Sequence, residues 1–145
     1  MLSADEKGVL VENPDRVDEA KFLALALAEF PNLADEFAED EDLFHVQMGT
    51  FSRVAKEAIE RGDYATLKRC YKIADDAMKN ATPSVENAVY VSFLEHLYFE
   101  GSPYGVEAKR LLPLKLSQML VELEEHFQML WEAQQAQSVE EHNAK

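Results

Sequence analysis

The fold is decided by residues 46–80, which read VQMGTFSRVAKEAIERGDYATLKRCYKIADDAMKN. Apolar residues recur there every three or four positions, the spacing that gathers them on one face of a helix. Gly62 suits the left-handed position that ends a helix, and Asp63 suits the N-cap of the next one. The stretch predicts two amphipathic helices, one from about Val46 and one over about residues 64–80, joined as an antiparallel hairpin.

Similar signals place helices before and after this hairpin. Asn13-Pro14 combines a capping residue with proline at the first helical position and predicts a helix from Pro14 to Phe30, ended by Pro31. Thr82-Pro83 repeats the signal and opens a nearly all-apolar helix to about residue 99. We expect a helix with so little polar surface to lie at the centre of the fold.

The C-terminal part is divided by prolines. Gly101-Ser102-Pro103 breaks the chain, a further helix begins near Tyr104, and Pro113 separates it from a last helix over Leu114 to about Gln137. We therefore expect one all-α domain over residues 1–137, with five to six helices in antiparallel hairpins and with residues 1–13 and 138–145 poorly ordered. A short α-α superhelix of stacked hairpins and a helical bundle both stay open.

The charge of the chain is strongly negative and unevenly distributed. There are 28 acidic and 14 basic residues, a formal charge of -14, which argues against a protein that neutralises nucleic-acid phosphates. Residues 1–45 hold thirteen acids and three bases, whereas residues 46–110 hold nine of each. A concentrated negative field of this kind accelerates association with a basic partner.

The densest acidic stretch holds six acids in the eight residues Asp35 to Asp42, where a short helix around Leu33 to Phe37 and a following loop are expected. We interpret it as a candidate docking surface for a basic protein, with phenylalanines and Leu43 as apolar anchors; the candidate partner-binding residues are Asp35, Glu36, Phe37, Glu39, Asp40, Glu41, Asp42 and Phe44. The alternative is a solvated loop that only keeps the protein soluble. Asp42-x-x-His45 within this region predicts weak, non-specific cation binding at most.

Motifs of nucleotide and metal chemistry are absent from the sequence. The five glycines form neither GxGxxG nor GxxxxGK[ST], and there is no HExxH and no pair of ExxH units. The single cysteine, Cys70, lies among apolar neighbours and is expected to be a core residue. We expect no cofactor, no resident metal and no enzymatic activity.

Glu95 and His96 are a candidate buried polar site because they lie within the apolar helix predicted after Pro83. A buried imidazole there could act as a general base in a small-ligand- or metal-dependent protein, or could be an ordinary satisfied core histidine. Glu95 could also pair with Lys109 or Arg110.

The two ends of the chain suggest a location and a second kind of contact. Residues 1–10 have neither the basic start nor the apolar stretch of an export signal, and the longest apolar runs are too short to span a bilayer, so a cytoplasmic protein is expected. Phe127, Leu130 and Trp131 on the last helix could meet a twofold mate, making a structural homodimer a further alternative.

Several short motifs share a layout with a known group of proteins. They are Phe30-Pro31-x-Leu33, Gly62-Asp63-Tyr64, Asn87 leading to Phe93-Leu94-Glu95-x-Leu97, and Leu111-Leu112-Pro113. The layout resembles an uncharacterised family of small, acidic, all-helical bacterial proteins over about residues 15–127. Some members of such families resemble toxin-immunity proteins, which implies an inhibitor that binds a basic partner and implies no catalytic residue.

Overall fold

The computed structural model describes residues 15–97 and 99–143, with side chains as far as Ser138. Within these ranges the protein has seven α-helices and no β-strand, which confirms the all-α prediction and comes close to the predicted five to six helices. The helices are α2 (Glu19–Glu29), α3 (Ala34–Glu39), α4 (Phe44–Arg61), α5 (Tyr64–Met78), α6 (Pro83–Ala88), α7 (Gly105–Arg110) and α8 (Leu114–Asn143). None of these helices combines the length and the apolar character needed to cross a membrane.

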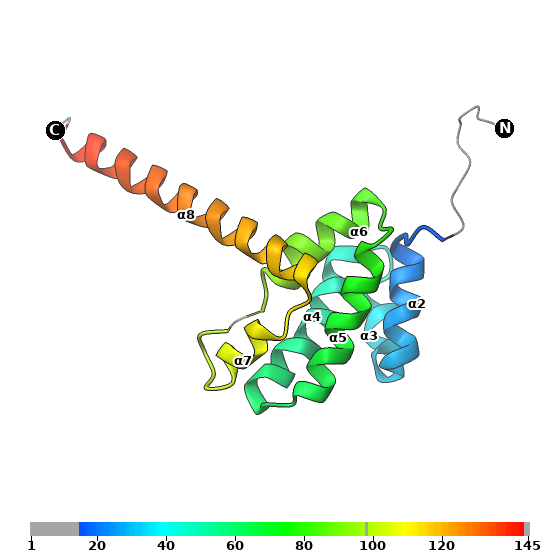
Figure 1. Ribbon diagram of the computed structural model, residues 1–145. Coiled ribbons are helices and arrows are strands. Elements are labelled where there is room, and N and C mark those ends of the chain that lie inside the picture. The colour runs from blue at the N-terminus through cyan, green and yellow to red at the C-terminus, as the bar shows by residue number, and fades with distance from the viewer. Residues whose placement is uncertain (1–14, 98, 144–145) are drawn as a thin grey trace.

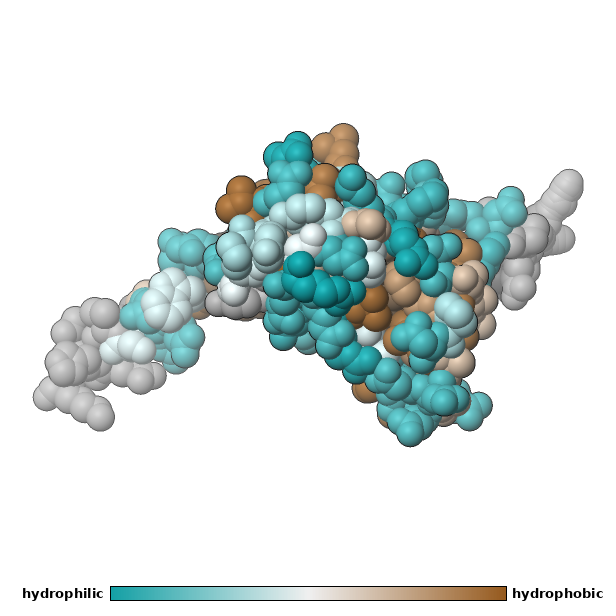
Figure 2. All heavy atoms as spheres, turned by 90° about the horizontal axis from the view of Figure 1, so that it is seen from below, coloured by the Kyte–Doolittle hydropathy of each residue, from teal (hydrophilic) through white to brown (hydrophobic). Residues whose placement is uncertain are grey.

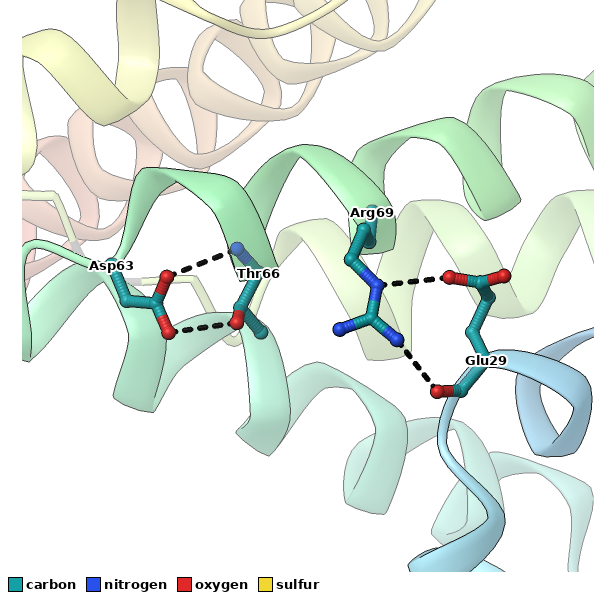
Figure 3. Close-up of polar contacts among 4 residues, drawn as sticks. All are labelled: Glu29, Asp63, Thr66 and Arg69. Atoms are coloured by element: carbon teal, nitrogen blue, oxygen red, sulfur yellow. Dashed lines mark hydrogen bonds and ion pairs between the residues drawn. The ribbon is translucent and has the colours of Figure 1, made fainter.

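Helices α4 and α5 form the hairpin predicted from their junction. Gly62 ends α4 in the left-handed conformation, with φ of 70°. The Asp63 carboxylate accepts hydrogen bonds from the hydroxyl of Thr66 at 2.7 Å and from its backbone amide at 3.1 Å (Figure 3). These hydrogen bonds lower the pKa of Asp63, so the cap of α5 is charged at neutral pH.

Arg69 of α5 fastens α2 to this hairpin. Its Nε donates to the Glu29 carboxylate at 2.9 Å, and its Nη2 donates to the Glu29 carbonyl oxygen at 2.7 Å (Figure 3). The guanidinium also lies 4.7 Å from the ring centre of Phe30. Since α2 has no basic residue in its own last turn, Arg69 supplies the positive charge that stabilises this C-terminal end.

One hydrophobic core joins all seven described helices. At its centre the ring of Phe51 lies edge-on to Phe22 of α2 at 5.4 Å and stacks on Phe93 at 5.3 Å. Tyr71 of α5 donates a buried hydrogen bond to the Ala108 carbonyl oxygen of α7 at 2.8 Å. In Figure 1, α2 and α3 flank one side of the hairpin, while α7 and the start of α8 lie on the other.

The first helix begins later than predicted. Asp18 caps α2 by accepting a hydrogen bond from the Lys21 amide at 2.8 Å, whereas the predicted cap at Asn13-Pro14 lies outside the described residues. Val17 cannot join the helix because it pairs with Ala81 in an isolated parallel β-bridge, which holds the chain extended before α2. Pro31 ends the helix as expected, and a 3-10 turn, Pro31–Leu33, leads into α3.

Two later boundaries also differ from the prediction. The helix that opens at Thr82-Pro83 is α-helical only to Ala88, continues as a π-helix over Val89–Leu94, and does not reach residue 99. Pro113 separates α7 from α8 as predicted. Helix α8 then runs to Asn143 instead of ending near Gln137.

Candidate functional site

The acidic surface consists of α3 and the loop between α3 and α4. Its members are Asp35, Glu36, Glu39, Asp40, Glu41 and Asp42. Asp35 and Glu36 occupy the first turn of α3, where the helix dipole favours negative charge. Except for Glu36 and Asp40, which are half-buried, these side chains are exposed.

Two features fix this surface to the body. The Gln47 side chain, buried on α4, donates a hydrogen bond to the Phe37 carbonyl oxygen at 2.8 Å and holds the end of α3 in place. Asp42 adopts the left-handed conformation, with φ of 68°, and turns the chain into α4. Aspartate tolerates this conformation better than most residues, so the turn is compatible with the sequence.

The acidic surface keeps most of its charge uncompensated. Glu36 forms an ion pair with Arg53 of α4 at 2.7 Å, and the hydrogen bond from Arg53 lowers the pKa of Glu36. In the described part of the chain, no ion pair is formed by the other five acids, Asp35, Glu39, Asp40, Glu41 and Asp42. Five neighbouring carboxylates, four of them exposed and that of Asp40 half-buried, therefore have no cationic partner among the described residues.

The predicted aromatic anchors of this surface are wrong. Phe37 and Phe44 are buried in the core, because α3 packs on α4 and because Phe44 begins the core-facing stripe of α4. Of the three proposed anchors only Leu43 is exposed, and it is joined by Val46, which the prediction missed. The sequence did contain a signal for Val46. The buried residues of α4 recur every three or four positions from Phe44, and Val46, two positions after Phe44, does not lie on that face.

The predicted buried pair Glu95 and His96 is also corrected. Both side chains are exposed, because the π-helix ends at Leu94 and the chain turns there. His96 Nδ1 donates a hydrogen bond to the Ser92 carbonyl oxygen at 2.8 Å. Glu95 has neither of its expected partners, since Lys109 pairs with Glu124 and Arg110 pairs with Glu107.

His96 nevertheless lines a small cavity that the sequence did not reveal. We call it the His96 pocket; it has a volume of about 260 Å³ and is lined by Gly49, Ser52, Arg53, Lys56 and His96. Ser52 and Arg53 of α4 lie three and four residues after Gly49 and four and three before Lys56, so the four residues share one face of that helix. This spacing is the signal that could have identified them. The pocket brings together Lys56 and Arg53, of which Arg53 is paired with Glu36.

Buried hydroxyl groups organise the backbone behind this pocket. Ser52 donates a hydrogen bond to the Phe93 carbonyl oxygen at 2.9 Å, and His45 Nδ1 lies 2.6 Å from the Ser92 hydroxyl oxygen. His45 therefore contacts Ser92 of the π-helix through its Nδ1 atom. Among the described residues, no three His, Cys, Asp or Glu side chains come together as a metal site.

The fold and these surfaces define a small all-α domain with an uncompensated acidic surface and a basic pocket. A family model described as Domain of unknown function (DUF7674) matches residues 23–131, and the chain belongs to that family. The resemblance to an uncharacterised family is thereby confirmed, and the matched range extends along α8 to Trp131. No curated protein and no solved structure matches the chain.

Proposed function

We propose that this chain is a non-enzymatic, cytoplasmic protein-binding domain that docks a basic partner through its acidic surface. The observation that supports this proposal is the set of five uncompensated carboxylates around α3 and the following loop. Unpaired charges of one sign raise the association rate of an oppositely charged protein, an effect that weakens as salt increases.

Leu43 and Val46 give the acidic surface a short-range component. Both side chains are about half exposed and lie next to Asp42 in the sequence. Charge accelerates encounter, whereas burial of apolar side chains at the centre of an interface slows dissociation. We therefore place Leu43 and Val46 at the centre of the docked interface and the carboxylates around them.

Inhibition follows if the natural ligand of the partner is itself a polyanion. A basic surface that binds phosphates would be occupied by the carboxylates of α3, so the polyanion and this domain would compete for one site. An immunity-type or regulatory inhibitor would act in this way. The proposed activity is therefore blockage of a basic enzyme or toxin by binding.

The test compares affinity capture by three forms of the full chain in a lysate of the organism that encodes it. One form is unchanged; in the second, the five uncompensated acids are replaced by Asn or Gln. The third is a charge-matched control in which five exposed acids elsewhere are replaced by Gln: Glu57, Glu60, Glu86, Glu95 and Glu100. We expect a basic protein to be enriched by the unchanged and control forms and lost from the second.

Two outcomes count against the proposal. Capture of the same proteins by all three forms would show that the acidic surface is not the docking site. Equal loss from both substituted forms would show that only the overall net charge matters. All ten positions lie on the surface or are only partly buried, so we expect both substituted forms to keep the fold. Circular dichroism of each form checks this expectation.

The His96 pocket supports a second candidate, the binding of a small anion. Lys56 forms no ion pair in the described part of the chain, and a Cβ atom on Gly49 would meet no atom within 4 Å, so the cavity has room. Titration of inorganic phosphate, followed by amide chemical shifts, should perturb α4 around Lys56 and should lose this effect in Lys56→Gln. Shifts that are unchanged, or equal in both forms, would exclude this candidate.

A further inference from the structure

Helix α8 has two halves in different surroundings. The inner half packs on the body through Leu116, Met119, Leu120 and Leu123, all of them buried. From Glu124 to Ser138 every side chain is exposed. At about 1.5 Å per residue the outer half is roughly 22 Å long, and Figures 1 and 2 show it standing clear of the body, to the left in both views.

One side of the outer half is apolar. Phe127, Leu130 and Trp131 are 44%, 53% and 58% exposed, and we call them the outer stripe. Phe127 follows the buried Leu123 by four residues, and Leu130 and Trp131 follow Phe127 by three and four. The outer stripe therefore continues the core-facing side of α8 into solvent. Apolar residues at this spacing are the ones through which a helix pairs with a second helix.

A hollow lies at the base of the outer stripe. Its volume is about 120 Å³, and it lies between α8 and the turn that follows the π-helix. The buried side chains of Leu97, Phe99 and Leu123 belong to its apolar lining, and Phe127 of the outer stripe borders it. An apolar cavity of about 150 Å³ holds a benzene molecule. The hollow therefore has room for one leucine-sized side chain of a partner.

Carboxylates surround this hollow. Glu95, Glu100 and Glu124 also line it, and all three side chains are exposed. Lys109 pairs with Glu124 at 3.0 Å, whereas Glu95 and Glu100 form no ion pair in the described part of the chain. A partner that fills the hollow with an apolar group therefore meets two unpaired negative charges at its rim.

The rest of α8 has the same sign of charge. Residues 116–138 include no lysine and no arginine, and their glutamates are Glu122, Glu124, Glu125 and Glu132. A helix is about 10–12 Å wide, which is close to the screening length of about 8 Å, so glutamates on its far side also act on a charge beside the stripe. A second copy of this chain would bring the same negative charges to the face. A helix rich in lysine or arginine would be attracted to it.

We propose that the hollow and the outer stripe bind a basic amphipathic helix of another protein. One apolar residue of this helix occupies the hollow, and its next apolar residues lie along Leu130 and Trp131. Its lysines or arginines pair with Glu95 and Glu100. The apolar contacts slow dissociation, and the charges select a basic helix over a neutral or acidic one.

This site is separate from the acidic surface, which lies on the other side of the hairpin (Figure 1). The affinity capture described above distinguishes the two. A protein held at the hollow is lost when Glu95 and Glu100 are replaced and is kept when the carboxylates of the acidic surface are replaced.

The test is titration of the full chain with a synthetic peptide of about 15 residues, which is long enough to form a helix. The peptide carries leucine at every third or fourth position and lysine elsewhere. Trp131 is the only tryptophan of the chain and the peptide has none, so its fluorescence reports binding at the outer stripe directly. The emission maximum should shift to shorter wavelength, because the indole leaves water. The same peptide with glutamate in place of lysine should cause no shift.

Two pairs of glutamate substitutions separate the charge at the hollow from the net charge. Glu95→Gln with Glu100→Gln should weaken binding of the lysine peptide about fivefold, because two ion pairs at the rim are lost. Glu57→Gln with Glu60→Gln removes the same charge from exposed positions of α4 and should leave the affinity unchanged.

Two exposed apolar residues of α8 test the outer stripe in the same way. Leu130→Gln should weaken binding about fivefold or more, because an apolar contact is lost. Met129→Gln changes a side chain that lines a different hollow with Glu122 and Glu125, so it should bind as the unchanged protein does. Unchanged thermal unfolding shows that neither variant acts through the fold.

Several results would overturn the proposal. They are no shift with the lysine peptide, an equal shift with both peptides, and equal weakening by the two members of either pair of variants. A shift of Trp131 emission with protein concentration alone would show that a second copy covers the outer stripe instead. None of these results bears on docking through the acidic surface, because Trp131 reports only the α8 face.

Discussion

Two glycines lie in opposite surroundings, and this difference decides which of them can be replaced. A Cβ atom on Gly105 would lie 1.5 Å from the Phe99 carbonyl oxygen, which is a backbone atom and cannot move aside alone. Gly49 lies inside α4, where a Cβ atom would meet nothing within 4 Å. The sequence alone does not distinguish the two, because the close approach to Phe99 is a tertiary contact.

We predict that Gly105→Ala lowers the free energy of unfolding by about 2–4 kcal/mol, because the backbone must shift. Gly49→Ala should raise it by about 0.5–1 kcal/mol, because alanine loses less backbone entropy in a helix. Urea unfolding followed by circular dichroism measures both. Equal effects of the two substitutions would contradict the packing described around Gly105.

The reactivity of the Cys70 thiol tests whether the core around it is closed to solvent. Burial raises its pKa to about 12, so the thiol is neutral at pH 8 and shielded from reagents. We predict that a disulfide reagent labels the native protein at pH 8 only as fast as the protein opens, and labels it immediately in denaturant. Labelling of the native protein at the rate of a free thiol would show that Cys70 is accessible.

At the scale of elements, the helix ends that depend on nearby residues could be predicted from the sequence. Those that depend on contacts with distant residues differ from the prediction. Gly62, Asp63 and Pro113 act on neighbouring backbone groups, so the ends of α4, α5 and α7 could be predicted. The start of α2 could not, because Val17 is held by Ala81, a residue far away in the sequence.

The π-helix is the second element that sequence periodicity could not predict. Its apolar residues would be buried in an α-helix as well, so the pattern does not choose between them. Ser52 of α4, whose hydroxyl is buried, donates a hydrogen bond to the Phe93 carbonyl oxygen within the π-helix. A contact of this kind joins residues far apart in the sequence, so periodicity alone does not reveal it.

We expect Ser52→Ala to lower the free energy of unfolding by about 1–2 kcal/mol, because it removes a buried hydrogen bond to the Phe93 carbonyl oxygen. Ser84→Ala is the control: its hydroxyl bonds to Glu19 on the surface, and its loss should cost less than about 0.5 kcal/mol. Thermal unfolding of both variants measures the difference. A smaller loss of stability at Ser52 than at Ser84 would show that the buried hydrogen bond to Phe93 does not stabilise the π-helix.

At the scale of the whole molecule, the position of the charge was predictable but the anchors were not. Acidic side chains stay in water wherever the chain folds, so their clustering in the sequence predicts a clustered surface. Whether Phe37, Leu43 or Phe44 faces outward depends on how α3 and α4 meet, and two of the three proved to be buried. The His96 pocket likewise exists only because the turn after the π-helix meets α4.

The acidic surface and the part of α8 beyond Leu123 are separate regions of the molecule. The first rests on the body, whereas the second projects from it (Figure 1).

The most direct test of docking through the acidic surface is the salt dependence of affinity for the purified captured partner, measured by calorimetry. For the unchanged chain we predict that log Kd rises steeply with log salt concentration, because unpaired carboxylates are screened. With Asp35, Glu39, Asp40, Glu41 and Asp42 replaced by Asn or Gln, affinity at low salt should fall at least tenfold, roughly 1.4 kcal/mol, and the slope should flatten. Equal affinity and equal slope in the two forms would contradict it.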